Sequence, residues 1–158
     1  MNNPVLHGIS AISETVLFGN YCTVWQFTTI CEHTVIGHGS VIGSGVWIGK
    51  NCRIGNNVHI QHGAFIPNGT VLEDNVFIGP LVVLTDDKYP RSGNDDYIPN
   101  PPRICQGASI GAGAVILPGV VVEAGAMIGA GAVVTHSVGY GDLSLGNPAR
   151  SQYHEVRP

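Results

Sequence analysis

Two groups of side chains in this 158-residue sequence could carry acid–base or binding chemistry. The first centres on His62, and its other polar members are Asn57, His59 and Gln61. The second is a polar, proline-rich stretch that begins near Asp86 and contains Tyr89 and Arg91. An imidazole or a carboxylate can accept a proton from a nucleophile, and a guanidinium can bind an anion. A scaffold must hold both groups at the surface.

An apolar residue at every sixth position predicts that scaffold. The series runs from Ile12 to Leu84 and resumes from Ile104 to Val134. A period of six fits neither the 3.6 of an α-helix nor the alternation of an ordinary strand. It is typical of a hexapeptide-repeat parallel β-helix, in which each repeat supplies one short strand and one turn. Two residues before each marker, small or β-branched residues such as Cys52 and Ala64 are expected to point into the narrow core.

Three hexads form one coil of eighteen residues, so the nineteen markers predict about six triangular coils. We expect an all-β fold and a single domain over residues 1–158. Its repeats span 12–84 and 104–137, and a C-terminal tail spans 138–158.

The repeat is interrupted once, between Leu84 and Ile104. Twenty residues replace six there, so about fourteen are extruded as a loop near 85–103. Long loops inside compact repeat folds are commonly functional. The loop is therefore the main candidate for a functional insertion.

Stacking the sequence in rows of eighteen predicts which side chains lie above one another. The three corner columns are Gln26, Ser44, His62 and Pro80; His38, Asn56 and Asp74; and Glu32, Lys50, Asn68 and Asp86. His62 and Asp86 could thus approach one cleft, from the same copy of the chain or from two copies. The alternative is that these polar side chains only face water or a partner subunit.

Composition limits the function classes. The net charge of −4 argues against nucleic acid or a membrane surface as partner. No apolar run has the length of a membrane span and the N-terminus lacks a signal-peptide pattern, so we expect a soluble, cytoplasmic protein. The four cysteines form no CxxC pair, and buried packing is expected for them. Most basic residues lie in the loop, its exit and the tail, where they could meet phosphates: Lys88, Arg91, Arg103, Arg150 and Arg157.

The pattern resembles the left-handed β-helix of the hexapeptide acyltransferases, and the left hand is implied by that resemblance. In this family such a loop reaches a neighbouring subunit of a trimer and completes the active site. Five segments are similar to N-acetyltransferases that modify nucleotide-linked amino sugars or to sugar acetyltransferases generally: 24–27 (VWQF), 60–63 (IQHG), 72–80 (LEDNVFIGP), 85–91 (TDDKYPR) and 146–150 (GNPAR).

The resemblance implies a homotrimer that moves an acetyl group from acetyl-CoA to the amine of a nucleotide-linked deoxyamino sugar. His62 or Asp86 would orient the amine or take its proton. Ala112 and Ala130 match corners that contact the pantetheine arm, and Arg150 matches a basic residue near the adenosine end. The candidates for binding the sugar nucleotide are Trp25, Gln26, Asn57, His59, Gln61, Tyr89, Arg91 and Tyr97.

The sequence also departs from the family pattern. Gln26 replaces the usual His, and His62 with Gly63 replaces two Asn. The O-acetyltransferases for galactosides and maltose carry a catalytic His where this chain has Tyr89, before Pro90. Because a hydroxyl acceptor needs a base, this loss weakens O-acetylation of a saccharide, which remains the alternative.

Two further alternatives come from other classes. A γ-class carbonic anhydrase would bind zinc through three histidines, and His33 and His38 have a spacing used there. Their positions relative to the markers are shifted and no third His lies one coil earlier, so no metal is expected. An ice-binding β-helix would show a flat array of Thr, which the mixed corner columns lack.

Overall fold

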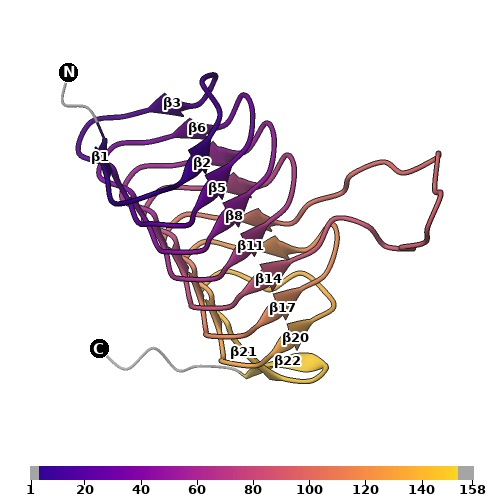
Figure 1. The fold of residues 1–158 in the computed structure, drawn as a ribbon. Helices are drawn as coiled ribbons and strands as arrows, with labels where there is room; N and C mark the ends of the chain where they lie inside the picture. The colour runs from indigo at the N-terminus through magenta and orange to yellow at the C-terminus, as the bar shows by residue number, and fades with distance from the viewer. Residues whose placement is uncertain (1–3, 153–158) are drawn as a thin grey trace, which may run out of the picture.

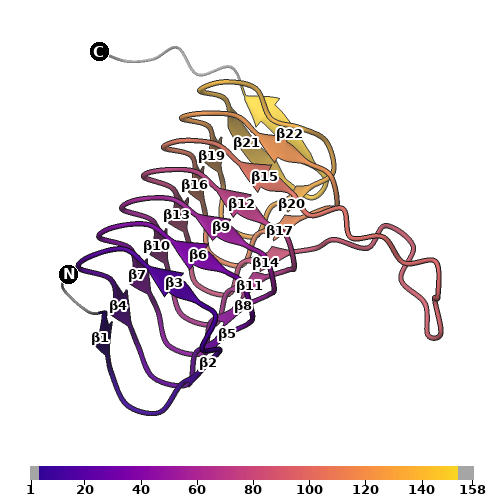
Figure 2. The same cartoon turned by 90° about the horizontal axis from the view of Figure 1, so that it is seen from above.

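The computed structural model describes residues 4–152 as a parallel β-helix with triangular coils (Figures 1 and 2). Within these residues there is no helix long and apolar enough to cross a membrane. The strands form three sheets, here called A, B and C.

Sheet A contains β1 (Val5–Leu6), β4 (Thr23–Val24), β7 (Val41–Ile42), β10 (His59–Ile60), β13 (Phe77–Ile78), β16 (Ser109–Ile110), β19 (Met127–Ile128), β21 (Leu143–Gly146) and β22 (Ala149–Gln152). Sheet B contains β2 (Ala11–Ile12), β5 (Thr29–Ile30), β8 (Trp47–Ile48), β11 (Phe65–Ile66), β14 (Val83–Leu84), β17 (Val115–Ile116) and β20 (Val133–Val134). Sheet C contains β3 (Leu17–Phe18), β6 (Val35–Ile36), β9 (Arg53–Ile54), β12 (Val71–Leu72), β15 (Arg103–Ile104) and β18 (Val121–Val122).

The six-residue period maps directly onto these strands. The apolar marker is the second residue of a two-residue strand and points into the core, as for the fully buried Ile60 and Ile78. Parallel pairing places Ile60 between Ile42 and Ile78, which confirms the spacing of eighteen. Beyond the loop, Ile78 pairs with Ile110, as expected if fourteen residues are extruded. The predicted all-β parallel β-helix is confirmed.

The small inward residues do more than pack. The Thr34 hydroxyl donates to the Gly49 carbonyl at 2.8 Å, and the Cys52 thiol donates to the Pro67 carbonyl at 3.1 Å. Ser40 makes the same kind of contact with Gly55. These bonds satisfy corner carbonyls that would otherwise lie buried without a donor. Burial raises the pKa of the Cys52 thiol to about 11, so this thiol stays protonated and can donate.

The fold extends further than the sequence indicated. Within the described residues, sheet A has seven two-residue parallel strands and then β21, so there are more coils than the six predicted. The repeat begins one hexad before Ile12, with Leu6 in β1, and β21 adds a further level after Val134. The expected tail is structured as the antiparallel β21–β22 hairpin, whereas Arg157 lies outside the described residues. Arg103 belongs to β15, which shortens the loop to 85–102.

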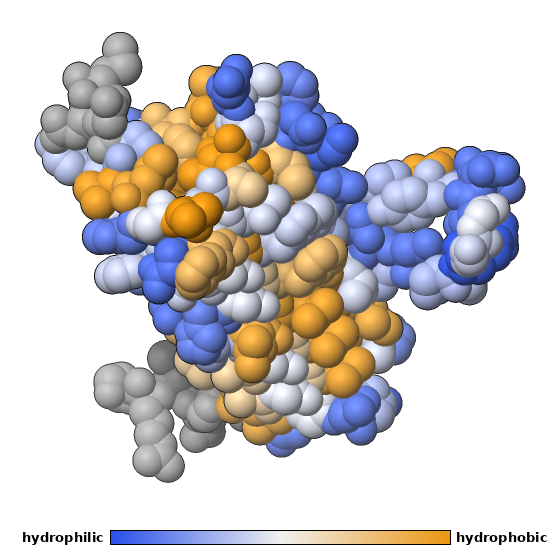
Figure 3. Space-filling model, viewed as in Figure 1, coloured by the Kyte–Doolittle hydropathy of each residue, from blue (hydrophilic) through white to orange (hydrophobic). Residues whose placement is uncertain are grey.

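The three outer faces differ. On sheet B the outward residues are almost all apolar, and Trp47 stacks on Phe65 with ring centroids 4.7 Å apart. Figure 3 shows hydrophobic residues gathered over β14, β17 and β20, whereas the projecting loop is mostly hydrophilic. The loop leaves the corner between sheets B and C and extends away from the coils (Figure 1). The prism therefore presents one apolar face and one polar arm.

Candidate active site

The corner that leads from sheet A to sheet B, the AB corner, collects several predicted site residues. Backbone bonds tie the column together: Gly63 donates to the Ser44 carbonyl at 2.9 Å, and Leu81 donates to the His62 carbonyl at 3.0 Å. Further along, Gly113 donates to Pro80 and Gly131 donates to Ala112, each at 2.8 Å. The order along this edge is therefore Gln26, Ser44, His62, Pro80, Ala112 and Ala130.

His62 is exposed at this corner, directly after β10. Its backbone is approached closely by the coil above, because a Cβ at Gly43 would lie 2.6 Å from the His62 nitrogen. His59 points outward from β10, beside Phe77 of β13. His59, Gln61 and His62 thus lie on one coil and can face one ligand.

Asn57 is separated from this group. It lies at the other edge of β10, the CA corner between sheets C and A, with a positive φ of 53°. Its side-chain amide is 3.4 Å from Asn75 Oδ1, one coil further on. Asn tolerates this left-handed backbone conformation better than most residues. The structure therefore gives Asn57 a turn position.

Trp25 and Gln26 occupy the AB corner two coils before His62, because β4 and β10 flank β7 in sheet A. His7 stacks on the Trp25 indole with ring centroids 4.3 Å apart and 13° between the planes. Trp25 is 43% exposed, so it still offers aromatic surface. An aromatic platform of this kind can stack against a planar group.

Some backbone N–H groups at the AB corner have no acceptor among the described residues. Within residues 4–152, no acceptor binds the N–H of His62, Ala112 or Ala130. The residue one coil further on is Pro80 for His62 and Ala130 for Ala112, and neither side chain has a hydrogen-bond acceptor. Ala112 and Ala130 are also exposed. These N–H groups can therefore donate to a ligand.

The CA corner shows the opposite arrangement. There the N–H of His38 donates to Asn56 Oδ1 at 2.8 Å, and the N–H of Asn56 donates to Asp74 Oδ1 at 2.7 Å. His38 Nδ1 in turn accepts from the N–H of Asn20 at 2.9 Å. The Asn56 backbone N–H, together with its side-chain amide, lowers the pKa of Asp74. The column of His38, Asn56 and Asp74 is therefore a capping ladder that runs along the corner.

An apolar hollow of about 300 Å³ adjoins the alanine end of the AB corner. Phe77 and Met127 project into it from sheet A, and Gly111, Gly129 and Ala130 form its edge. Phe77 and Met127 were not among the predicted site residues. Their position directly before a marker, in the same outward column as His59, was the signal that could have identified them.

Arg150 lies on β22, at the end of sheet A that is nearest to Ala130. It is exposed, and its Nη1 donates to the Ala149 carbonyl at 2.9 Å. Neither of the two ion pairs among residues 4–152 involves it. Its positive charge remains available to an anionic group.

The loop gathers the second predicted group around a cavity of about 240 Å³ lined by Asp86, Tyr89, Arg91 and Tyr97 among others. The Tyr97 hydroxyl donates to Asp86 Oδ2 at 2.5 Å. Burial, together with the bond to Asp86, raises the pKa of Tyr97 to about 12. Arg91 Nη2 donates to Asn94 Oδ1 at 3.0 Å, and Lys88 Nζ lies 5.5 Å from the centre of the Tyr89 ring.

The two predicted catalytic residues lie on different edges of the prism. His62 is at the AB corner, and Asp86 follows β14 at the BC corner between sheets B and C. Figure 2 shows the loop leaving on the side opposite to the sheet that contains β4, β7 and β10. One copy of the chain therefore does not bring His62 and Asp86 together.

Arg103 was expected to meet anions, but its guanidinium binds Glu73 Oε1 at 2.5 and 3.0 Å, and that bond lowers the pKa of Glu73. Arg103 is thus paired with Glu73 of the same chain. His33 and His38 lie at different corners, BC and CA, and no three potential metal-binding side chains cluster among residues 4–152.

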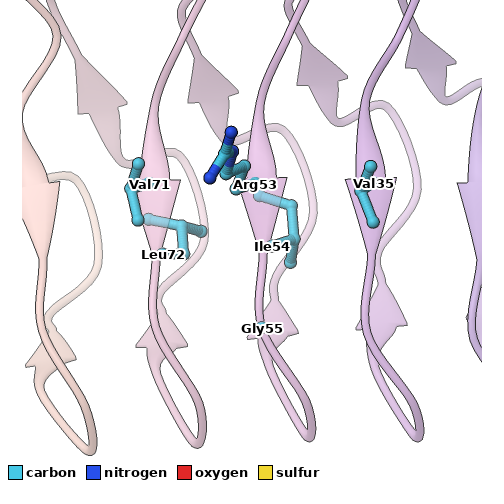
Figure 4. A pocket seen from close by; sticks show the side chains of 6 residues that line it. All are labelled: Val35, Arg53, Ile54, Gly55, Val71 and Leu72. Carbon is cyan, nitrogen blue, oxygen red and sulfur yellow. The ribbon is translucent and has the colours of Figure 1, made fainter.

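Another hollow, of about 400 Å³, lies on sheet C between neighbouring strands (Figure 4). Val35, Arg53 and Val71 line it from β6, β9 and β12. It contains none of the predicted site residues. The AB corner and the loop therefore remain the candidate site.

Comparison with known proteins supports the same scaffold. A family model described as bacterial transferase hexapeptide (six repeats) matches residues 51–86 and 101–136. A second model, the hexapeptide repeat of succinyl-transferase, matches residues 28–62. Together they cover more than half of the chain. No curated protein matches the sequence significantly.

Solved structures with a similar fold include several acetyltransferases. A mutant of GDP-perosamine N-acetyl transferase from Caulobacter crescentus, in complex with CoA and GDP-perosamine, is 22% identical with a TM-score of 0.70; the match covers 97% of this chain and 58% of that one. For the acetyltransferase domain of PglB from Neisseria gonorrhoeae with acetyl coenzyme A, the values are 23%, 0.58, 94% and 57%. For the hexapeptide-repeat acetyltransferase VCA0836 from Vibrio cholerae with acetyl coenzyme A, they are 26%, 0.64, 75% and 69%.

The chain thus spans less than two thirds of the length of the first two structures. What it shares with all three is the repeat scaffold, and the two hexapeptide family models together cover more than half of its residues. The chain belongs to the bacterial hexapeptide-repeat transferase family.

Proposed function

We propose that the protein transfers an acetyl group from acetyl-CoA to the amine of a nucleotide-linked deoxyamino sugar, in a cleft between subunits of a homotrimer. The order of groups along the AB edge carries this proposal. Arg150 lies at one end, Ala130 and Ala112 follow, His62 is central, and Trp25 with Gln26 lies at the other end. A donor site, a base and an acceptor site thus follow one another.

The alanine end suits the pantetheine arm of acetyl-CoA. The unpaired N–H groups of Ala112 and Ala130 can donate to its amide carbonyls, while Phe77 and Met127 cover its methylene groups. Ala130 lies three coils from His62, roughly 14 Å at ~4.8 Å per strand. The arm would place the thioester near His62 and the phosphates near Arg150.

At His62 the chemistry is acyl transfer. The neutral amine of the sugar attacks the thioester carbonyl carbon, the new C–N bond forms, and the C–S bond breaks. His62 takes the proton that the amine nitrogen loses and passes it to the departing thiolate. An unpaired corner N–H, such as that of His62, can stabilise the developing oxyanion.

The loop supplies the case for an intersubunit site. Asp86, Tyr89 and Arg91 leave the BC edge, so the loop of a second copy can bring them to the AB edge that carries His62. The apolar outer face of sheet B, with stacked Trp47 and Phe65, is a suitable contact for that copy. Light scattering should give the mass of a trimer.

Mixing two inactive variants tests the shared site directly. Trimers co-assembled from His62→Ala and Asp86→Ala subunits should regain part of the wild-type activity, because some clefts then contain both intact residues. Mixed trimers as inactive as their parents would contradict a site built from two subunits.

The relatives support the donor and the acceptor class. The Neisseria and Vibrio structures contain acetyl coenzyme A, and the Caulobacter structure contains CoA with a nucleotide-linked sugar. The decisive experiment is a screen of UDP-, dTDP- and GDP-linked amino sugars with acetyl-CoA, read out as thiol release. Turnover of amino sugars supports the proposal. Turnover confined to acceptors that carry only hydroxyl groups would instead establish O-acetylation.

A further inference from the structure

We propose that Tyr97 is a positioning residue that holds Asp86 and closes the neck of the loop, where its first residues lie beside its last ones. The kinetic part of this inference rests on the proposed function, whereas the loop closure does not. The sequence suggests Tyr97 as a group that binds the sugar nucleotide. The structure instead directs its hydroxyl at Asp86, at 2.5 Å.

Asp86 is held at two points. Its side chain accepts from Tyr97, eleven residues further along, and its backbone carbonyl accepts from the N–H of Asn100 at 2.8 Å. Asn100 also accepts from the N–H of Gly119 at 2.7 Å, which belongs to the next coil. The first and last segments of the loop are thus joined to each other and to the coils. We call these contacts of Asp86, Tyr97 and Asn100 the loop clasp.

The clasp also orients the carboxylate. Oδ2 is engaged by Tyr97, and no protein donor among the described residues binds Oδ1. Because the raised pKa of Tyr97 keeps its hydroxyl protonated at any ordinary assay pH, the tyrosine always acts as the donor. The remaining oxygen is therefore free to accept a hydrogen bond from a substrate amine.

Two loop variants separate the clasp from the charge. Tyr97→Phe removes the donor but leaves the carboxylate, whereas Asp86→Asn keeps an acceptor for Tyr97 but removes the negative charge. Tyr140→Phe is the matched control, because Tyr140 is exposed, lies outside the loop and makes no side-chain hydrogen bond among residues 4–152. Since the loop projects from the coils and Tyr140 is exposed, all three variants should keep the wild-type Tm.

Limited trypsin digestion measures the clasp without any substrate, because Lys88 and Arg91 both lie inside the loop. Loss of one charge-assisted hydrogen bond should speed cleavage at these sites about tenfold in Tyr97→Phe. Asp86→Asn should be cleaved more nearly at the wild-type rate. If Tyr97→Phe is cleaved no faster than Tyr140→Phe, the clasp does not exist.

Kinetics test the positioning role. Tyr97→Phe should lower kcat while the KM for acetyl-CoA stays unchanged, and Asp86→Asn should lower kcat although its loop stays closed. A Tyr97→Phe enzyme with an open loop and wild-type kcat would limit the clasp to loop structure and overturn the positioning role. If the wild-type enzyme acetylates no amino sugar, the proposed function fails, but the digestion still decides whether the clasp exists.

Discussion

The AB and CA corners have the same backbone path and opposite hydrogen bonding. At the CA corner, side chains of Asn56 and Asp74 cap the N–H groups of the coil above. At the AB corner the equivalent positions are Ala112 and Ala130, whose side chains accept no hydrogen bond, and their own N–H groups have no acceptor within residues 4–152. One edge of the prism therefore stabilises the stack, and the other leaves its donors to a ligand.

This difference explains why small residues mark a functional edge here. Alanine at a corner would ordinarily be taken only as a tight turn. Because a polar side chain at the same place caps the coil above, alanine leaves a site open instead of filling it.

The largest effect is expected for the imidazole at the AB corner. His62→Ala should lower kcat by roughly 10²–10⁴-fold, since a proton acceptor is lost, with acetyl-CoA affinity little changed. His38→Asn at the CA corner is the control, because Asn supplies a new acceptor for the N–H of Asn20. Steady-state kinetics measure both. Wild-type turnover in His62→Ala would remove this residue from the chemistry.

The next effect concerns the unpaired donors. Ala130→Pro removes one N–H group, and the fold should tolerate it because Pro80 occupies the equivalent corner position in another coil. The KM for acetyl-CoA should rise about 3–10-fold, because the loss of one hydrogen bond weakens binding by about this factor. The Tm should not change. An unchanged KM would show that this N–H group does not contact the donor.

A smaller effect should follow from adding one capping side chain at the AB corner. In Ala130→Asn, the new Oδ1 can accept the N–H of Ala112 as Asn56 accepts that of His38. We expect a higher Tm together with a KM for acetyl-CoA raised a few-fold. Thermal unfolding and kinetics measure the two effects. A raised Tm with unchanged KM would separate capping from donor binding.

The smallest effect is the pH dependence of the CA corner. Hydrogen bonds from Asn56 hold the pKa of Asp74 below its usual value of 3.8, so the carboxylate stabilises the fold above that value. This stabilisation is lost as the pH falls from about 3.8 through the lowered pKa. Asp74→Asn should flatten this part of the Tm profile without altering kcat. An identical acid slope in both proteins would contradict the role of Asp74.

Most of the scaffold could be predicted because its packing repeats. Every marker from Val24 to Val134 became the buried residue of a strand, whereas Ile12 and Phe18 are only partly buried. The extruded length of the loop set the register of Ile110 correctly. The AB column with His62 followed from the same count. The contacts of Thr34 and Cys52 with carbonyls one coil away could not be read from a pattern of small residues.

The site was less predictable where the period stops. The clasp joins residues eleven positions apart, and its geometry depends on loop turns that have no repeat. For the same reason the hairpin after residue 142 was expected only as a tail. The ion pair of Arg103 with Glu73 required the register across the loop. A periodic sequence thus predicts a periodic structure. Single contacts within or across an insertion are seen only in the three-dimensional structure.

The β21–β22 hairpin affects whether a further coil can be stacked on this end of the β-helix. A parallel β-helix can in principle add coils indefinitely, since each coil presents the same two-residue strands to the next. Here the four-residue strand β22 runs antiparallel along the edge of sheet A, so a further coil would meet a different pattern of donors and acceptors. At this edge, a further coil would therefore not find the parallel two-residue strand that the other coils offer one another.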